Sequence, residues 1–209
     1  MTILFKNIIH NFKFTKQELV TISDICSLSL TAREKWAHPD FLPIYSRLKN
    51  YFLIYQNKTC YFCQKKLVTI TNEDWHIDHI VSVDEDDRHV FTAENWILVC
   101  KWCNRDKNSK KILKNRPKSK AYSKSSANYK IIHPRYDDYS IHIDILSEMI
   151  YTSLTPKGKE TKSACNLERF QLKYLSNLNS TDRDYIEGAL KFLLSNNPRS
   201  LSAFLKSLQ

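Results

Sequence analysis

Four cysteines stand in two pairs whose spacing suits a metal ion. Cys60 and Cys63 form one CxxC motif, and Cys100 and Cys103 form a second one after a gap of 36 residues. Two residues between thiolates let both sulfur atoms reach one ion at about 2.3 Å, and two such pairs complete a tetrahedral shell. Because four sulfur ligands leave no open position, the spacing predicts a structural zinc site. The alternative, a redox-active CxxC motif, fits two copies around one strand-rich segment poorly.

Polar residues that could act on a substrate lie between and beside these pairs. Metal binding pins the ends of residues 60–103 together, so we expect it to gather these side chains beside a helix that begins near Asn104. The residues gathered in this way are His76, Asp78, His79, Asn95 and Asn104.

This segment resembles the HNH endonucleases of the ββα-metal (His-Me finger) type that carry zinc knuckles. In CYFC … HIDHI … ENWILVCKWCNRDK, the family pattern is matched by Asp78, His79 and Ile80, then by Asn95, and finally by Asn104. The resemblance covers roughly a quarter of the chain. It implies that Asp78 and Asn104 hold a catalytic divalent ion, and that hydrogen bonds from Asn95 hold a loop and orient His79.

Hydrolysis of a phosphodiester needs a nucleophile made from water and a sink for the charge of the phosphate. Histidine titrates near neutral pH, so His79 can take the proton of the water as general base. The ion implied at Asp78 and Asn104 would stabilise the phosphate and the departing 3′ oxygen, and hard oxygen ligands favour Mg²⁺ or Mn²⁺. In a regular strand Asp78 and His79 point to opposite faces, so sharing one site requires a twist or bulge at the strand end.

Some residues depart from the family pattern or stand outside it. Relatives often carry Glu in place of His76, which leaves open whether His76 is an additional metal ligand, a phosphate contact or a polar strand residue. We expect His89, in the acidic loop DEDDRHV, to be solvated. The isolated cysteines Cys26 and Cys165 are expected to be small buried hydrophobic residues.

Positive charge is concentrated in one segment. The net charge is +10, and residues 101–130 hold 11 Lys or Arg and one acid, so the rest of the chain has 21 basic and 21 acidic residues. A basic stripe of this kind favours binding to the phosphate backbone of a nucleic acid, with a merely solvated basic loop as the alternative. The predicted nucleic-acid contacts are Lys101, Arg105, Lys107, Lys110, Lys111, Lys114 and Arg116.

The fold class that these patterns predict is α+β, with a small ββα-metal core between two lobes. Capping boxes at Thr15 and Thr31, and Pro43 in a first helical turn, predict a helical N-terminal lobe. The strand-like runs WHIDHIVSV and NWILVC belong to the core. A hairpin turn is expected around Gly158, with helices after it. The predicted domains are residues 1–57 (N-terminal lobe), 58–115 (nuclease core), 116–130 (exposed basic linker or arm) and 131–209 (C-terminal lobe).

A second resemblance lies in the C-terminal part. It is similar to the same part of HNH proteins of Septu-type bacterial defence systems, which implies an effector nuclease of anti-phage defence that works with an ATPase partner. The alternative is a packed polar turn over residues 133–142 that braces the basic arm against the core. The residues that carry the resemblance are His133, Pro134, Asp137, Asp138, His142, Lys157, Gly158 and Leu167 to Arg169.

The sequence therefore predicts a metal-dependent endonuclease that hydrolyses DNA, with RNA as an alternative substrate. A zinc-knuckle nucleic-acid-binding module without catalysis, a stand-alone restriction-like nuclease and a partner-gated subunit remain as other readings. Lys6, His10 and Lys13 interrupt the apolar runs near the N-terminus, and no run of ~18 apolar residues could span a membrane. We expect the cytoplasm, where reduced thiols are free to bind metal.

Overall fold

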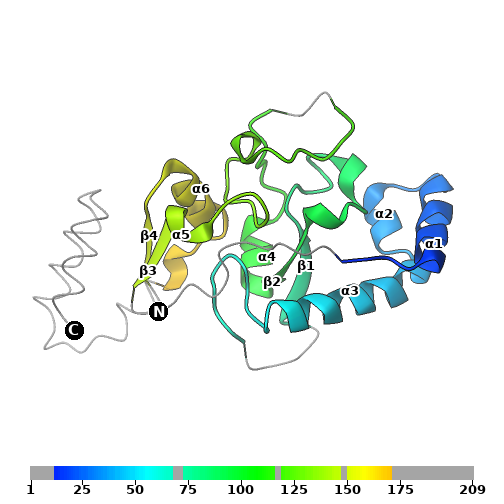
Figure 1. Ribbon diagram of the computed structural model, residues 1–209, viewed down its shortest axis with the longest axis horizontal. Helices are drawn as coiled ribbons and strands as arrows, with labels where there is room; N and C mark the ends of the chain where they lie inside the picture. Colours follow the sequence, from blue (N-terminus) through cyan, green and yellow to red (C-terminus); the bar gives the residue numbers. More distant parts are fainter. Residues whose placement is uncertain (1–11, 68–72, 116–118, 147–149, 171–209) are drawn as a thin grey trace, which may run out of the picture.

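The computed structural model describes residues 12–67, 73–115, 119–146 and 150–170, which are coloured in Figure 1. In this part of the chain helices combine with two antiparallel two-stranded sheets, so the predicted α+β class is confirmed. None of the described helices has the length and apolar character needed to cross a membrane. The helices predicted beyond residue 170 lie outside the described residues.

The described N-terminal lobe is helical, as predicted. Both capping boxes are present, because Thr15 and Thr31 each accept a hydrogen bond from the third residue of the helix that they precede. Pro43 lies in the first turn of its helix, where its missing N–H has no partner to lose. The elements are α1 (Lys16–Ser27), α2 (Ala32–Trp36), the 3-10 helix η1 (Pro39–Phe41) and α3 (Leu42–Tyr55).

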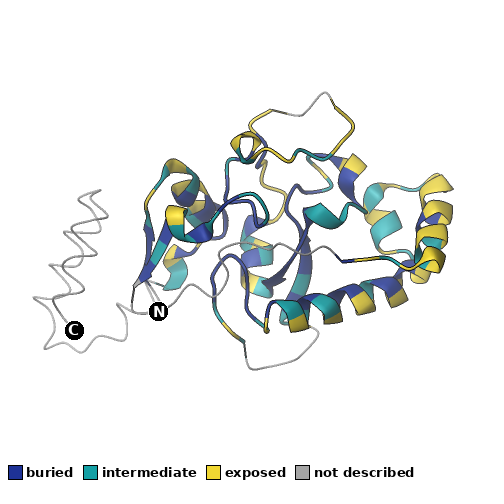
Figure 2. Cartoon of the chain, viewed as in Figure 1, coloured by how far each residue is buried: buried dark blue, intermediate teal, exposed yellow. Residues whose placement is uncertain are grey.

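Helix α3 packs one apolar face against the central sheet, and this buried face is dark blue in Figure 2. Ile44, Leu48 and Phe52 recur at helical spacing and are buried there. At the end of α3, the amide of Gln56 accepts a hydrogen bond from the backbone N–H of Leu98 and donates one to its C=O, at 3.0 and 2.9 Å. The helix is thereby fixed to a strand at both the apolar face and the C-terminus.

The central sheet and the helix after it form the core that the sequence predicts. Strands β1 (Trp75–His79) and β2 (Trp96–Cys100) are antiparallel, with His79 opposite Trp96. Helix α4 (Lys101–Lys107) follows β2 directly, so it begins three residues before the predicted start at Asn104. The reason is that Cys100 caps this helix, with its sulfur accepting from the N–H of Cys103 at 3.5 Å. The loop between the strands contains the 3-10 helices η2 (Asp87–His89) and η3 (Ala93–Asn95).

The C-terminal part contains the predicted hairpin, but Gly158 is not in its turn. Gly158 lies in the first turn of a helix that Thr155 caps, and a Cβ atom there would stand 2.0 Å from the carbonyl oxygen of His142. Glycine is therefore needed for the close approach of this helix to the preceding one. The elements are α5 (Tyr139–His142), strands β3 (Ile143–Leu146) and β4 (Ile150–Ser153), and α6 (Pro156–Ala164).

The arm predicted as exposed is anchored at the ends that the structure describes. Leu113 and Tyr129 form a β-bridge and both are buried. The carboxylate of Glu85 accepts hydrogen bonds from the backbone N–H groups of Ile112 and Leu113, each at 2.9 Å. Most of the described residues between 119 and 130 are exposed, as predicted, whereas Tyr129 is buried and anchors the end of the arm. The short 3-10 helix η4 (Ser126–Asn128) lies within it.

All buried hydrophobic residues of the described chain except Val90 and Ile150 form one cluster, from Phe12 to Leu167. The C-terminal part contacts the first cysteine pair directly, since the hydroxyl of Tyr139 donates to the carbonyl of Phe62 at 2.7 Å. Tyr151 donates in the same way to Cys63 at 2.6 Å. The three boundaries between the four predicted domains remain a prediction, but the described lobes share this core.

Candidate active site and metal centre

The four paired cysteines meet at one point in the interior. Their sulfur atoms all lie within 4.8 Å of one another, and all four residues are buried. Zinc–sulfur bonds of about 2.3 Å in a tetrahedron place sulfur atoms about 3.8 Å apart. The sulfur atoms of Cys63 and Cys100, from different pairs, are 4.0 Å apart. The cluster therefore fits a single ion with four thiolate ligands.

A guanidinium from the C-terminal part stands beside this cluster. Arg169 donates a hydrogen bond to the sulfur of Cys103 at 3.1 Å and lies 3.4 Å from the carboxylate of Asp106. Four thiolates around a divalent ion carry excess negative charge, so a cation in contact with a ligand atom stabilises the bound state. The sequence contains no local pattern that would have revealed Arg169, because 66 residues separate it from Cys103.

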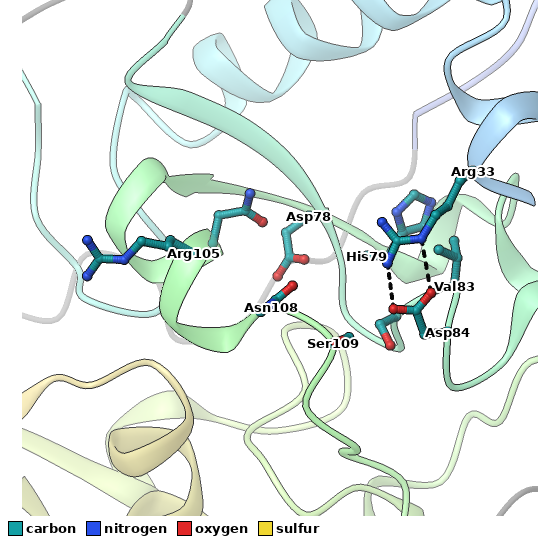
Figure 3. Close-up of a pocket in the computed structure, with 10 residues that line it drawn as sticks. Arg33, Asp78, His79, Val83, Asp84, Arg105, Asn108 and Ser109 are labelled. Carbon is teal, nitrogen blue, oxygen red and sulfur yellow. Dashed lines mark hydrogen bonds and ion pairs between the residues drawn. The ribbon is translucent and has the colours of Figure 1, made fainter.

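A pocket of about 280 Å³ contains three of the predicted site residues (Figure 3). Asp78 and His79 reach it from the end of β1, and Asn104 reaches it from α4. The two neighbours on β1 share the pocket because the strand ends at His79 and the chain bends at Ile80. This bend is the irregularity at the strand end that a site shared by Asp78 and His79 requires.

The ring of His79 is held in one orientation. Its Nε2 lies 2.9 Å from the carbonyl oxygen of Val90, which also accepts from the indole of Trp96 at 3.0 Å. Because a carbonyl can only accept, Nε2 carries the proton and Nδ1 is left with a lone pair. Burial lowers the pKa of His79 to about 4, so the imidazole is neutral at pH 7. Trp36 packs edge-to-face on this ring, at 4.4 Å between centroids.

Asp78 is paired with a buried lysine. The ammonium of Lys107 lies 3.0 Å from one carboxylate oxygen and donates to the carbonyl of His79 at 2.8 Å. Burial raises the pKa of Asp78, and the charge of Lys107 opposes that rise. Lys107 was predicted as an exposed nucleic-acid contact, but its side chain is fully buried. The structure corrects this placement, since α4 turns Lys107 toward β1.

Asn95 lies outside the pocket and braces the loop above it. Its side chain accepts from the N–H of Val81 at 2.8 Å and donates to the carbonyls of Val81 and His89, at 3.0 and 3.2 Å. Its own carbonyl accepts from Ile80 at 2.8 Å. These bonds fix both ends of the loop between β1 and β2, and this loop carries Val90, whose carbonyl contacts His79. The geometry suits the supporting role that the resemblance implies, and its effect on catalysis remains a prediction.

A chain of hydrogen bonds joins Asn95 to the C-terminal part. His133 Nδ1 accepts from the backbone N–H of Arg135 at 3.2 Å, so the ring proton is on Nε2. Nε2 lies 2.9 Å from the hydroxyl of Tyr122, which donates to the side-chain oxygen of Asn95 at 3.1 Å. Burial lowers the pKa of His133 to about 3, which keeps the ring neutral. Sequence reasoning did not connect these residues to the site.

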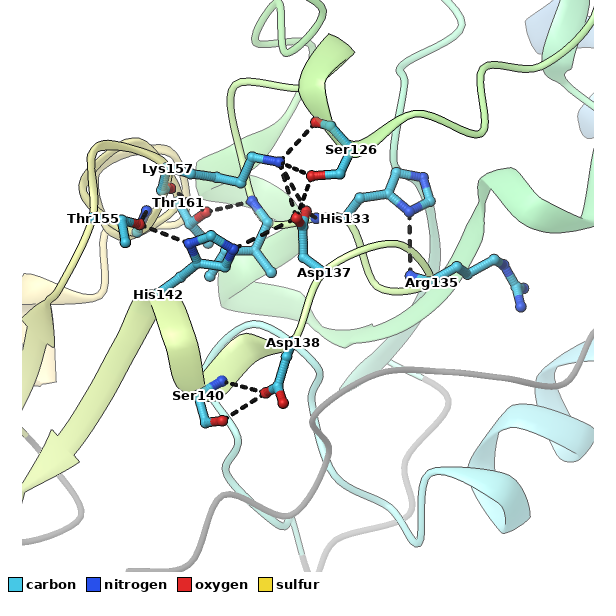
Figure 4. Close-up of polar contacts among 12 residues, drawn as sticks. Ser126, His133, Arg135, Asp137, Asp138, Ser140, His142, Thr155, Lys157 and Thr161 are labelled. Carbon is cyan, nitrogen blue, oxygen red and sulfur yellow. Dashed lines mark hydrogen bonds and ion pairs between the residues drawn. The ribbon is translucent and has the colours of Figure 1, made fainter.

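Several residues of the second resemblance meet in one polar network around Asp137 (Figure 4). The carboxylate accepts from the N–H of His133 at 2.7 Å and from the hydroxyl of Ser126. The ammonium of Lys157 lies 3.0 Å from the carboxylate and donates to the carbonyl of Ser126 at 2.7 Å. The ring nitrogen Nε2 of His142 lies 3.5 Å from an oxygen of the same carboxylate. Since Ser126 belongs to the predicted arm, the network ties the arm to the C-terminal part, as the packed-turn alternative requires.

We expect Lys157→Met to lower the free energy of unfolding by about 2 kcal/mol at pH 7, the scale for a hydrogen bond to a charged group. Burial raises the pKa of Asp137, but hydrogen bonds from His133, Ser126 and Lys157 outweigh it and leave the pKa lowered. The contribution of this carboxylate is therefore present above its unfolded pKa of about 3.9 and is lost as the pH falls through the folded value. Urea unfolding of both proteins at pH 7 and pH 3 should show a smaller difference at pH 3.

The control for this prediction is Lys159→Met, which removes an exposed lysine from the same helix. Its stability should match that of the unaltered protein at both pH values. Equal losses from the two lysine substitutions would contradict the assigned role of the Asp137 network.

Other predicted residues lie elsewhere than expected. His76 lines a different pocket, of about 400 Å³, with Tyr45 and Lys49 from α3, and its role as an additional metal ligand stays a prediction. His89 is buried near Asp86 rather than solvated, because the loop folds over it. Cys26 is exposed, since only one side of α1 packs inward, whereas Cys165 is buried as predicted.

The remaining predicted nucleic-acid contacts that the structure describes are exposed or half-buried. Arg105 lines the pocket and is 60% exposed. Lys101 is paired with Asp74 at 3.3 Å, and the ammonium of Lys110 donates to the carbonyl of Ala164 at 2.8 Å. The other three are Lys111 and Lys114, which are exposed, and Arg116, which lies outside the described residues.

An exposed aromatic residue that sequence reasoning missed lies on the same helix. Trp102 is 48% exposed, and its ring is flanked by Lys101 and Arg105, whose charged groups lie 5.2 and 4.8 Å from the ring centroid. Its position between two cysteines of the metal cluster fixes it close to the pocket. An exposed tryptophan among cations offers a stacking surface for a base of a nucleic acid.

Residues 60–110 match the family model described as HNH endonuclease. The matched segment contains both cysteine pairs, β1, β2 and α4, so the metal-binding cluster and the pocket residues Asp78, His79 and Asn104 belong to an HNH endonuclease segment. The match supports a nuclease function, and it ends before the C-terminal part, for which the resemblance to Septu-type proteins stays a prediction. No curated protein and no solved structure matches the chain.

Proposed function

We propose that this protein is a metal-dependent endonuclease that hydrolyses phosphodiester bonds of DNA. The observation that carries the proposal is the pocket shared by His79, Asp78 and Asn104, in which His79 is neutral and its Nδ1 is left as an acceptor. In this proposal zinc is bound by the four cysteines, and Mg²⁺ or Mn²⁺ by the two oxygen-bearing residues. The protein acts in the cytoplasm.

His79 takes the proton of the attacking water at Nδ1, while Val90 and Trp96 keep its other nitrogen oriented. A divalent ion at Asp78 and Asn104 would stabilise the charge of the phosphate and of the departing 3′ oxygen. The charge of Lys107 opposes the rise in pKa that burial causes at Asp78, and so favours the ionised form that a metal ligand needs. Each of these roles uses a group that the fold already holds in place.

The substrate is proposed to be a nucleic acid held mainly through its backbone. Exposed cations beside the pocket supply contacts that depend on charge rather than on base sequence, and Arg105 lies at the pocket itself. DNA is our choice because the segment matches an endonuclease family whose predicted chemistry needs no 2′-hydroxyl. Cleavage of RNA and not of DNA would show that RNA is the substrate in place of DNA.

We further propose a role as effector nuclease in bacterial anti-phage defence, beside an ATPase partner. The support is the resemblance of the C-terminal part, which rests on residues that include Asp137, His142, Lys157 and Gly158. Co-expression with the product of the neighbouring gene tests this role. Failure of the two proteins to form a complex, or a partner without ATPase activity, would refute it.

Asn104→Ala should raise the metal concentration needed for half-maximal cleavage by about tenfold or more, since even indirect partners of a metal ligand are worth that much. Asn104 is half-buried on a helix, where alanine is well tolerated. The measurement is plasmid and oligonucleotide cleavage against Mg²⁺ or Mn²⁺ concentration, with EDTA as the blank.

The matched variant is Asn104→His, because the family pattern accepts histidine at this position. It should keep most of the activity. Cleavage that persists in EDTA, or an alanine variant with unchanged metal dependence, would reject the proposed ion site. Absence of cleavage by the unaltered protein, with binding retained, would favour a nucleic-acid-binding module.

A further inference from the structure

An exposed ion pair stands at the rim of the candidate active site. The guanidinium of Arg33 donates two hydrogen bonds to the carboxylate of Asp84, at 3.0 and 2.5 Å. Both residues line the pocket that contains His79 and Asp78, and Figure 3 shows them side by side next to His79. Arg33 precedes the segment that matches the HNH family, so the match assigns no function to it.

Helix α2 delivers Arg33 to this position together with a second residue. Trp36 follows three residues later, on the same side of the helix, and packs against the ring of His79. The capping box of Thr31 and Glu34 fixes the start of α2. The distance of Arg33 from the proposed general base is thus set by a packed aromatic contact and not by a free loop.

Arg33 is one of two exposed cations that line the pocket in the described part of the chain, and unlike Arg105 it is paired with a carboxylate that also lines the pocket. Lys107 is fully buried and holds Asp78, and Arg105 is paired with its neighbour Asp106. Asp84 also receives a hydrogen bond from the side chain of Ser109, which anchors the carboxylate on the far side of the pocket. The side chains of Arg33 and Asp84 are 67% and 43% exposed. Exposed pairs are weak, so an incoming anion can compete for the guanidinium.

We propose that Arg33 binds the phosphate of the nucleic acid at the site, and that Asp84 holds it as a latch until the substrate arrives. This inference rests on the proposed nuclease function. A planar guanidinium that now binds two carboxylate oxygens can bind two phosphate oxygens in the same fork geometry. Until that exchange occurs, Asp84 neutralises Arg33 and repels an approaching phosphate. The latch therefore sets how tightly the site binds nucleic acid.

The test compares Arg33→Ala, Arg33→Lys and Asp84→Asn in binding of a fluorescent DNA duplex without added Mg²⁺ or Mn²⁺ and in cleavage with Mn²⁺. Arg33→Ala should weaken binding by about tenfold to a hundredfold, as for a lost charged hydrogen bond. It should also reduce the slope of log affinity against log salt by about 1, the value for one phosphate contact. Arg33→Lys should restore the salt slope but only part of the affinity, because lysine lacks the fork.

Asp84→Asn should act in the opposite direction. Release of Arg33 and removal of the repelling carboxylate should tighten binding by at least about threefold, the scale of one screened charge contact. The control is Lys16→Ala, which removes one exposed positive charge from α1 and should leave affinity and salt slope unchanged.

The two proposals fail in different ways. Cleavage that needs His79 but is unaffected by Arg33→Ala, with unchanged binding, would overturn the role of Arg33 and leave the nuclease function standing. Binding that follows the expected pattern without any cleavage would support Arg33 and reject catalysis. Absence of DNA binding by the unaltered protein would overturn both, and weaker binding by Asp84→Asn would overturn the latch.

Discussion

Replacing His79 with alanine should abolish DNA cleavage and leave the protein folded with its zinc content unchanged. A positioned general base contributes about 10²- to 10⁴-fold to a rate, so the loss should reach the detection limit of a nicking assay. The alanine also removes one hydrogen bond to Val90 and the contact with Trp36, and we expect only a modest drop in melting temperature from these. Plasmid nicking with Mn²⁺ measures the rate, and metal analysis with thermal melting measures the fold.

His76→Ala is the matched control, because it removes a histidine from the same strand that lies in a different pocket. Its cleavage rate should equal that of the unaltered protein. A rate that falls equally in both variants would point to damage of β1 and not to loss of a base. A His79 variant that still cleaves would remove this residue from the proposed mechanism.

The second large effect is expected from the metal cluster. Cys100→Ser should prevent zinc binding and unfold the core, because a structural zinc site is worth about 10–16 kcal/mol and a whole domain about 5–15 kcal/mol. The cluster lies between β2, α4 and the C-terminal part, so its loss affects more than the local knuckle. Zinc stoichiometry and circular dichroism during thermal unfolding provide the measurement.

Cys26→Ser serves as the control for this result. Cys26 is exposed and stands apart from the four clustered cysteines, so its replacement should leave zinc content and melting temperature unchanged. A Cys100 variant that stays folded with one zinc ion would show that the thiolates are not the metal ligands. Strong chelation should reproduce the Cys100 result in the unaltered protein.

Local sequence patterns predicted the elements whose causes are local. The capping boxes at Thr15 and Thr31, and the strands at HIDHI and NWILVC, depend on residues within a few positions of one another, and all are present. The start of α4 was misplaced, because Cys100 acts as a helix cap as well as a thiolate candidate. Gly158 was misread as a turn residue, because glycine also permits close helix packing.

Contacts between distant segments could not be predicted in the same way. The sequence predicted that His79, Asp78 and Asn104 share a site, and the structure brings them into one pocket. It did not predict that α2 would bring Arg33 to the rim, nor that Lys107 would turn inward to Asp78. Each depends on how whole helices pack on the sheet, and no spacing rule in one sequence specifies that.

The contacts of Tyr139 and Tyr151 with the first cysteine pair have a consequence for how the protein is made. They join residues 77 and 88 positions apart, so the knuckle can be sealed only after the chain has extended far beyond it. At about 5–20 residues per second, a ribosome needs roughly 5–20 s for that length. During this interval neither tyrosine covers the first cysteine pair, so zinc can reach these thiols from solvent. The nuclease segment is thus completed late in synthesis.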